Sequence, residues 1–168
     1  MRWPRSRFDF NCGGYALGTL DWYSPYSDYY DSMEEMIYDE NGYEINGVEY
    51  QDSMVEYMLS TLDNVRIAKD EYDCGKDERI VAFRCGEDDF HFVRKESDGT
   101  FTHKPGSHAI EPMTREQFYD PRGWDFRYDG PIVFLAIADK EEDAWRQRRI
   151  KNILESRKIT AQDLFIPF

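Results

Sequence analysis

The sequence predicts an α+β fold, with helices first, then an antiparallel sheet, then a closing helix. Three observations predict it. Residues 12–62 carry apolar side chains at helical spacing, residues 65–137 carry short β-prone runs separated by turn residues, and acidic residues 141–143 precede a basic segment. We find no internal repeat and no low-complexity linker in the 168 residues. We therefore expect a single domain over 1–168.

The first helix is expected over residues 12–23. Its apolar positions at helical spacing are Ala16, Leu17, Leu20 and Tyr23. The pair Gly13-Gly14 weakens this helix by about 1 kcal/mol per glycine. Residues of such low helix propensity at a helix start indicate that another part of the chain approaches the backbone closely.

Residues 24–64 form an acidic, tyrosine-rich insertion that we expect to cap the cleft of the molecule. Within it we predict a short helix over 33–38 and a small hairpin over 41–47, between two Asn-Gly turn signals. A further helix is expected to begin at a cap provided by Asp52 or Ser53. The apolar stripe of that helix is Val55, Met58, Leu59 and Leu62.

Strands are expected in the second half of the chain. They cover residues 65–68, 79–85, 89–95, 100–104 and 131–137. The last of these is the most apolar run, so we expect it inside the sheet rather than at an edge. The C-terminal helix carries Trp145, Ile150, Ile153 and Leu154 as its apolar residues.

The composition limits the partners of the protein. A net charge of −13 argues against nucleic acid or anionic lipid as a main partner, and no apolar run approaches the ~20 residues of a membrane span. Basic residues at the start lack a following apolar stretch, so no signal peptide is expected. Three cysteines are an odd number for a disulfide framework, which makes a cytoplasmic location the default. Release by lysis or by dedicated export would leave the same sequence pattern, and no cofactor or metal is predicted.

Two separate segments carry candidate chemistry. The first is Asn11-Cys12-Gly13-Gly14, at the start of the first predicted helix, and the second is the predicted hairpin with His91 and His103. A three-residue Ser-Asp-Gly loop with glycine in the left-handed position would pair Glu96 with Thr100. His103 would then lie diagonally across from His91 on one face of the hairpin, about 7–8 Å away between backbones. A loop of two or four residues would put the histidines on opposite faces.

These residues are the components of a cysteine nucleophile and its base. A helix N-terminus and a neighbouring imidazolium would both favour the thiolate of Cys12. In this interpretation His91 is the general base, His103 orients its ring, and the backbone N–H of Cys12 donates to an oxyanion. No side chain upstream is marked as a second oxyanion donor.

Asn11-Cys12-Gly13-Gly14 resembles the Asp-Cys-Ser-Gly signature of the NlpC-type cell-wall peptidases, a compact branch of the papain-like fold. In that family a histidine begins a strand after the cysteine helix and a second polar residue follows about a dozen positions later, as His91 and His103 do. The resemblance covers about residues 8–20 and 79–137. It implies a nucleophile helix packed on an antiparallel sheet, and hydrolysis of peptide or amide bonds, for example in peptidoglycan stem peptides. A transferase or a deamidase would use the same three residues.

Other readings of these residues remain open. Cys12 is also compatible with a small buried helix residue, in which case the chain is a non-catalytic binding or inhibitory protein, phage- or effector-related, with its acidic half as the contact surface. Cys74 and Cys85 with a histidine would make a zinc site, although their spacing favours separate structural roles. His108 is expected on the surface, Asp88-Asp89 at a strand start, and 120–123 in a turn. Tyrosines 23, 26, 29 and 30 are expected to pack.

Overall fold

The structure is a computed structural model that describes residues 10–26, 48–106 and 108–165. The helices of this part are α2 (Cys12–Leu17), α4 (Gln51–Thr61), α5 (Arg115–Phe118) and α6 (Ala144–Phe165), with a 3₁₀ turn η1 (Glu141–Asp143) before α6. The strands are β1 (Val65–Ala68), β2 (Glu78–Cys85), β3 (Phe90–Lys95), β4 (Phe101–His103), β5 (Glu111–Met113) and β6 (Val133–Ala138). The predicted elements over 33–38 and 41–47 lie outside the described residues.

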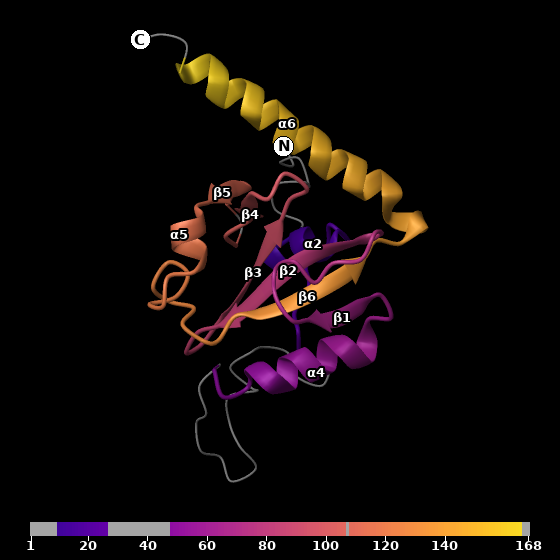
Figure 1. Ribbon diagram of the computed structural model, residues 1–168, viewed down its shortest axis with the longest axis vertical. Coiled ribbons are helices and arrows are strands. Elements are labelled where there is room, and N and C mark those ends of the chain that lie inside the picture. Colours follow the sequence, from indigo (N-terminus) through magenta and orange to yellow (C-terminus); the bar gives the residue numbers. More distant parts are fainter. Residues whose placement is uncertain (1–9, 27–47, 107, 166–168) are drawn as a thin grey trace, which may run out of the picture.

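The strands form one antiparallel sheet in the order β1-β6-β2-β3-β4-β5 (Figure 1). Five of these strands correspond to the five predicted from the sequence. The apolar run over 131–137 becomes β6, which lies between β1 and β2, so the prediction of an interior strand is confirmed. The α+β class is also confirmed, whereas a papain-like arrangement remains a proposal.

The two faces of the sheet carry different partners. On one face α2 and α4 pack on β2, β3 and β6, around a cluster that includes Cys12, Met54, Phe83 and Phe92. On the other face α5 and the loop that follows it cover Ala82 and Val93, with Phe118 and Trp124 as their large side chains. β3, the strand that carries His91, therefore has core residues on both faces of the sheet.

Two helix boundaries differ from the prediction. The first helix ends at Leu17 rather than near residue 23, because Gly18 takes the left-handed conformation (φ 79°) and the N–H of Leu20 returns to the carbonyl of Gly14. The second begins at Gln51 with no side-chain cap from Asp52 or Ser53. Gln51 is instead buried, where its amide joins the backbone of Cys85 to that of Pro131.

α4 belongs to the second part of the predicted insertion, yet it is a core element. Met54 and Met58 are fully buried in the cluster shared with α2. This part of the chain therefore supports the sheet, whereas residues 27–47 of the insertion lie outside the described residues. Tyr23 and Tyr26 pack edge-on against Phe92 and Phe90, as expected for packing residues, whereas tyrosines 29 and 30 lie outside the described residues.

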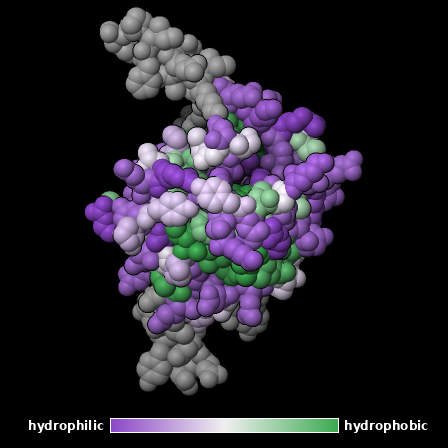
Figure 2. Space-filling view, in the orientation of Figure 1, coloured by the Kyte–Doolittle hydropathy of each residue, from purple (hydrophilic) through white to green (hydrophobic). Residues whose placement is uncertain are grey.

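α6 runs along one side of the molecule and projects beyond the sheet (Figure 1). Ile150 packs with Phe10, Tyr15 and Ile110, which anchors the first part of the helix. Figure 2 shows an apolar area over β1 and β6, surrounded by hydrophilic side chains. No helix in the described ranges is both long enough and apolar enough to cross a membrane.

Candidate active site

Asn11 fixes the start of the cysteine helix. Its side-chain oxygen accepts hydrogen bonds from the N–H groups of Gly14 and Tyr23, each at 3.0 Å. Its amide nitrogen donates to the carbonyl of Tyr23 at 2.7 Å. An aspartate could cap the helix but could not make the last of these bonds when ionised. The structure thereby gives Asn11 a role that an ionised aspartate could not fill.

Gly14 is required by a close approach of the chain, as its low helix propensity indicates. A Cβ at this position would collide with the backbone carbonyl of Asp21. A Cβ at Gly13 would lie 3.0 Å from Tyr23. The segment from Asp21 to Tyr23 thus folds back over the first turn of α2 and holds it against the sheet.

The thiol of Cys12 lies at the edge of β3. The N–H of Glu96 donates to the carbonyl of Thr100, so alternate residues of β3, including Phe92, direct their N–H groups toward β4. β4 ends at His103, before it can accept from Phe92. The amide of Phe92 instead faces the Cys12 thiol.

The thiol is nevertheless not poised as an anion. Cys12 is only 5% exposed, and burial raises the pKa of its thiol to about 12, although the amides of Phe92 and Gly13 act in the opposite direction. The expectation that the helix start and an imidazolium lower this pKa is therefore not met. The cause is that desolvation disfavours the charged form more than those two amides favour it.

The hairpin has the predicted geometry. Arg94 pairs with Thr102, and Gly99 has the left-handed conformation (φ 86°), so the Ser-Asp-Gly loop has three residues. His91 and His103 lie on one face of the sheet, where Nε2 of His91 is 2.8 Å from Nδ1 of His103. The predicted contact between the two imidazoles is confirmed.

Glu111 completes this chain of polar groups and was not identified from the sequence. It lies opposite His103 in the β4–β5 pairing, with its Oε1 3.3 Å from Nε2 of His103. When His103 carries its proton on Nε2, facing Glu111, its Nδ1 accepts from His91 Nε2–H. Nδ1 of His91 is then a free lone pair, which is the form required of a base.

Burial keeps both histidines neutral. It lowers the pKa of His91 to about 3, with His103 as a second cause. It also lowers the pKa of His103, against the opposing effect of Glu111. His91 is thus a neutral imidazole near neutral pH and not the imidazolium of a preformed ion pair.

Two aromatic residues hold the ring of His91. Tyr128 stacks on it with ring centroids 5.2 Å apart, and its hydroxyl donates to Asp89 at 3.0 Å. Trp124 meets the imidazole edge-on at 6.0 Å. Asp89 therefore acts on the imidazole through Tyr128. Trp124 and Tyr128 lie far after β3 in the sequence, so the residue pattern of the strand could not predict these contacts.

The histidine pair lines a cavity of about 470 Å³. His108, expected as ordinary surface, is exposed at the border of this cavity, together with Phe126 and Arg127. Cys12 does not line the cavity, and among the described residues no hydrogen bond joins its thiol to either histidine. The structure thus brings His91 and His103 together on one face of the sheet, whereas Cys12 packs with Phe83 and Phe92 on the other face and is not brought into contact with either imidazole among the described residues.

The remaining cysteines are separate. Cys74 is exposed and donates to the carbonyl of Glu78, whereas Cys85 is buried against Met54. The described residues contain no cluster of His, Cys, Asp and Glu able to hold a metal ion. The turn over 120–123 is confirmed, with Gly123 in the left-handed conformation.

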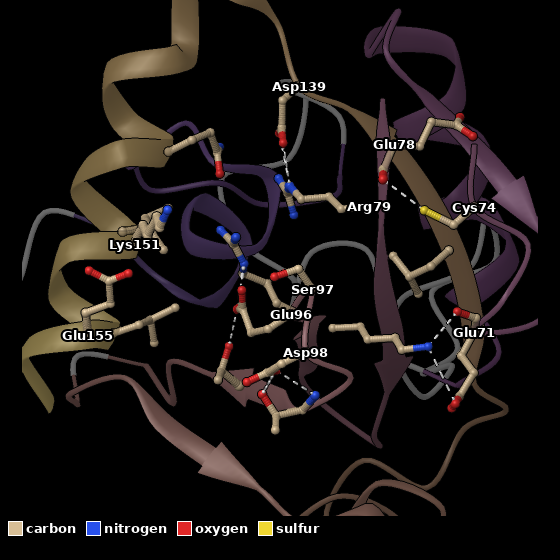
Figure 3. A pocket seen from close by; sticks show the side chains of 18 residues that line it. Glu71, Cys74, Glu78, Arg79, Glu96, Ser97, Asp98, Asp139, Lys151 and Glu155 are labelled. Atoms are coloured by element: carbon tan, nitrogen blue, oxygen red, sulfur yellow. Dashed lines mark hydrogen bonds and ion pairs between the residues drawn. The ribbon is translucent and has the colours of Figure 1, made fainter. Parts of the chain in front are cut away.

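A second cavity, of about 620 Å³, lies between the sheet and α6 (Figure 3). Arg79 pairs with Asp139 at its wall and also donates to the carbonyl of Ala16. Arg94 donates to the carbonyl of Tyr15 at 3.2 Å, and its Nε lies 3.2 Å from Glu96. Both arginines thereby bind the last turn of α2, so this wall fixes the helix from the end opposite to Cys12.

Comparisons of the chain with family models, with curated proteins and with solved structures found no match in any of the three. The resemblance to the NlpC-type peptidases therefore depends on the residues and geometry described above.

Proposed function

We propose that the protein is a thiol-dependent hydrolase of papain-like architecture that cleaves peptide or amide bonds. Cys12 is the nucleophile, His91 the general base and His103 the residue that orients it. The observation that carries this proposal is the hydrogen bond between Nε2 of His91 and Nδ1 of His103, which leaves Nδ1 of His91 as a free acceptor when His103 carries its proton on Nε2.

In the proposed reaction the Cys12 thiol leaves the amide of Phe92 and gives its proton to Nδ1 of His91 as sulfur attacks the substrate carbonyl. The N–H of Cys12, which has no acceptor within its own helix, donates to the oxyanion. The imidazolium then protonates the leaving amine, and water hydrolyses the thioester. Because thiol and imidazole both begin neutral, the proton moves during attack and not before it.

The proposed substrates are peptidoglycan stem peptides or similar small peptides. The test is incubation with peptidoglycan fragments, followed by mass spectrometry. Wild type should release products, Cys12→Ala and His91→Ala should not, and Cys74→Ser should behave as wild type because Cys74 is exposed and outside the site. Equal product release by wild type and Cys12→Ala would overturn the proposal.

One observation favours a second candidate, a non-catalytic binding protein. Cys12 is buried, its thiol has a raised pKa, and it does not line the cavity of the histidines. This candidate predicts that Cys12 is inert to alkylation in the folded protein and that no tested fragment is cleaved.

A further inference from the structure

Lys104 is a buried lysine at the end of the histidine hairpin. Its side chain is among the largest fully buried ones in the described residues, with the residue only 1% exposed. The ammonium lies 4.9 Å from the centre of the Phe10 ring and donates one hydrogen bond, to the carbonyl of Gly106 at 2.8 Å. An ammonium group has three donors, so this environment satisfies it in part.

No carboxylate of the described residues forms an ion pair with Lys104. Burying a charge without a counter-charge is costly, and lysines are almost never fully buried unless they are paired. A group that is able to become an anion next to this ammonium would compensate for part of that cost.

Cys12 is such a group. Lys104 follows directly after His103 and falls opposite Phe92 when the β3–β4 pairing is continued, and the amide of Phe92 faces the thiol. Phe10, beneath the ammonium, is two residues before Cys12. The electrostatic influence is mutual: the ammonium lowers the pKa of Cys12, and Cys12 counters the effect of burial by raising the pKa of Lys104.

We propose that Lys104 is a positioning residue that supplies the counter-charge of the Cys12 thiolate, and this inference depends on the proposed role of Cys12 as nucleophile. The neutral His91 accepts the proton of the thiol, and Lys104 keeps its own proton throughout. The ammonium thereby takes the electrostatic part that an imidazolium plays in a preformed thiolate–imidazolium pair. Asp89, at the start of β3, has the opposite effect on the thiol.

The experiment compares Lys104→Met, which removes the charge, with Lys104→Arg, which keeps it. The rate of iodoacetamide labelling is measured across pH on the peptide that carries Cys12. Cys74, exposed and distant from this site, is an internal control in the same molecule. Lys104→Met should raise the apparent thiol pKa and slow labelling of Cys12 near neutral pH by about twofold or more, because one pKa unit is a tenfold change in thiolate. Lys104→Arg should restore the rate, and labelling of Cys74 should not change.

Equal pH profiles of Cys12 in wild type and a folded Lys104→Met would overturn the proposal. If that variant does not fold, Lys104→Gln, which is also uncharged but keeps polar atoms at the site, replaces it in the same labelling comparison. Equal Cys12 profiles in wild type and Lys104→Gln would also overturn the proposal. A failure of the proposed function can be distinguished from a failure of the Lys104 proposal, because labelling measures the thiol directly and does not depend on substrate cleavage.

Discussion

Nε2 of His91 lies 2.8 Å from Nδ1 of His103, across two neighbouring strands. The contact follows from the length of one loop, since a three-residue turn is what puts both rings on the same face. Glu111 continues the contact to the next strand. When His103 carries its proton on Nε2, this order makes Nδ1 of His91 the nitrogen that is available to receive a proton.

We predict that His103→Ala lowers kcat/KM for a cleaved peptide by about tenfold to a hundredfold, a smaller loss than the about 10²–10⁴-fold expected for His91→Ala. The reason is that His103 holds the ring of His91 and does not itself exchange a proton with the substrate. His103→Asn, whose amide oxygen can accept the same hydrogen bond, should recover part of the rate. A variant His103→Ala with wild-type kinetics would contradict the orienting role.

The stability of the protein should fall as the pH falls below the ordinary histidine range. The pKa of His91 is about 3 in the folded protein, below its unfolded value of about 6.5, so the unfolded chain binds a proton first. Stability from this group is complete above pH ~6.5 and is lost between there and ~3, at about 1.4 kcal/mol per pH unit. Burial lowers the pKa of His103 in the same direction.

Denaturant unfolding at a series of pH values measures this dependence. His91→Gln should show a shallower loss of stability with acid than wild type. His108→Gln, at an exposed position, is the matched control and should follow the wild-type curve. The same slope in wild type and His91→Gln would show that other groups cause the acid sensitivity.

Asn11→Asp should lower the free energy of unfolding by about 1–3 kcal/mol, although Asp is an equally good helix cap. The substitution replaces a donor to the Tyr23 carbonyl by a second acceptor in a site that is 4% exposed. Urea unfolding measures the loss. Asn152→Asp, at an exposed position of α6, should have little effect. If both variants were equally stable, the bond to Tyr23 would have no energetic role.

Gly14→Ala should destabilise the protein by about 3 kcal/mol, because the new methyl group meets the backbone carbonyl of Asp21 and one of the two segments must shift. Gly99→Ala is the comparison, since nothing lies within 4 Å of its Cβ and only the left-handed backbone is unfavourable. That second cost is about 1–2 kcal/mol. Thermal unfolding of the two variants should show the larger loss for Gly14→Ala.

The elements that the sequence predicts best are those with a strong local signal. Alternating and apolar runs identified β1, β2, β3 and β6, and the Ser-Asp-Gly loop predicted the register that joins His91 to His103. β5 and α5 were not predicted, because each is too short for a periodic pattern to show. The capping box of Thr114 and Gln117 was the available signal for α5.

The protonation states of Cys12 and His91 depend on how deeply each side chain is buried, and a sequence motif does not predict burial. Cys12 and His91 were expected as a charged pair, but each lies where water is excluded, so the neutral forms prevail. Tyr128 and Glu111 reach the histidines from segments that follow them in the chain, and only the fold brings them there. Lys104 belongs to no motif of the sequence, and only the fold shows that it is buried.

β4 stops one residue short of the place where it would have covered the amide of Phe92, and that amide instead acts on the thiol of Cys12, whose pKa it lowers. Alkylation or acylation of the sulfur would change the surroundings of this amide. Deuterium uptake at the amide of Phe92 in β3 would then change when the side chain of Cys12 in α2 is modified. Because β4 stops short of Phe92, hydrogen exchange at this amide would therefore indicate whether the sulfur of Cys12 is modified.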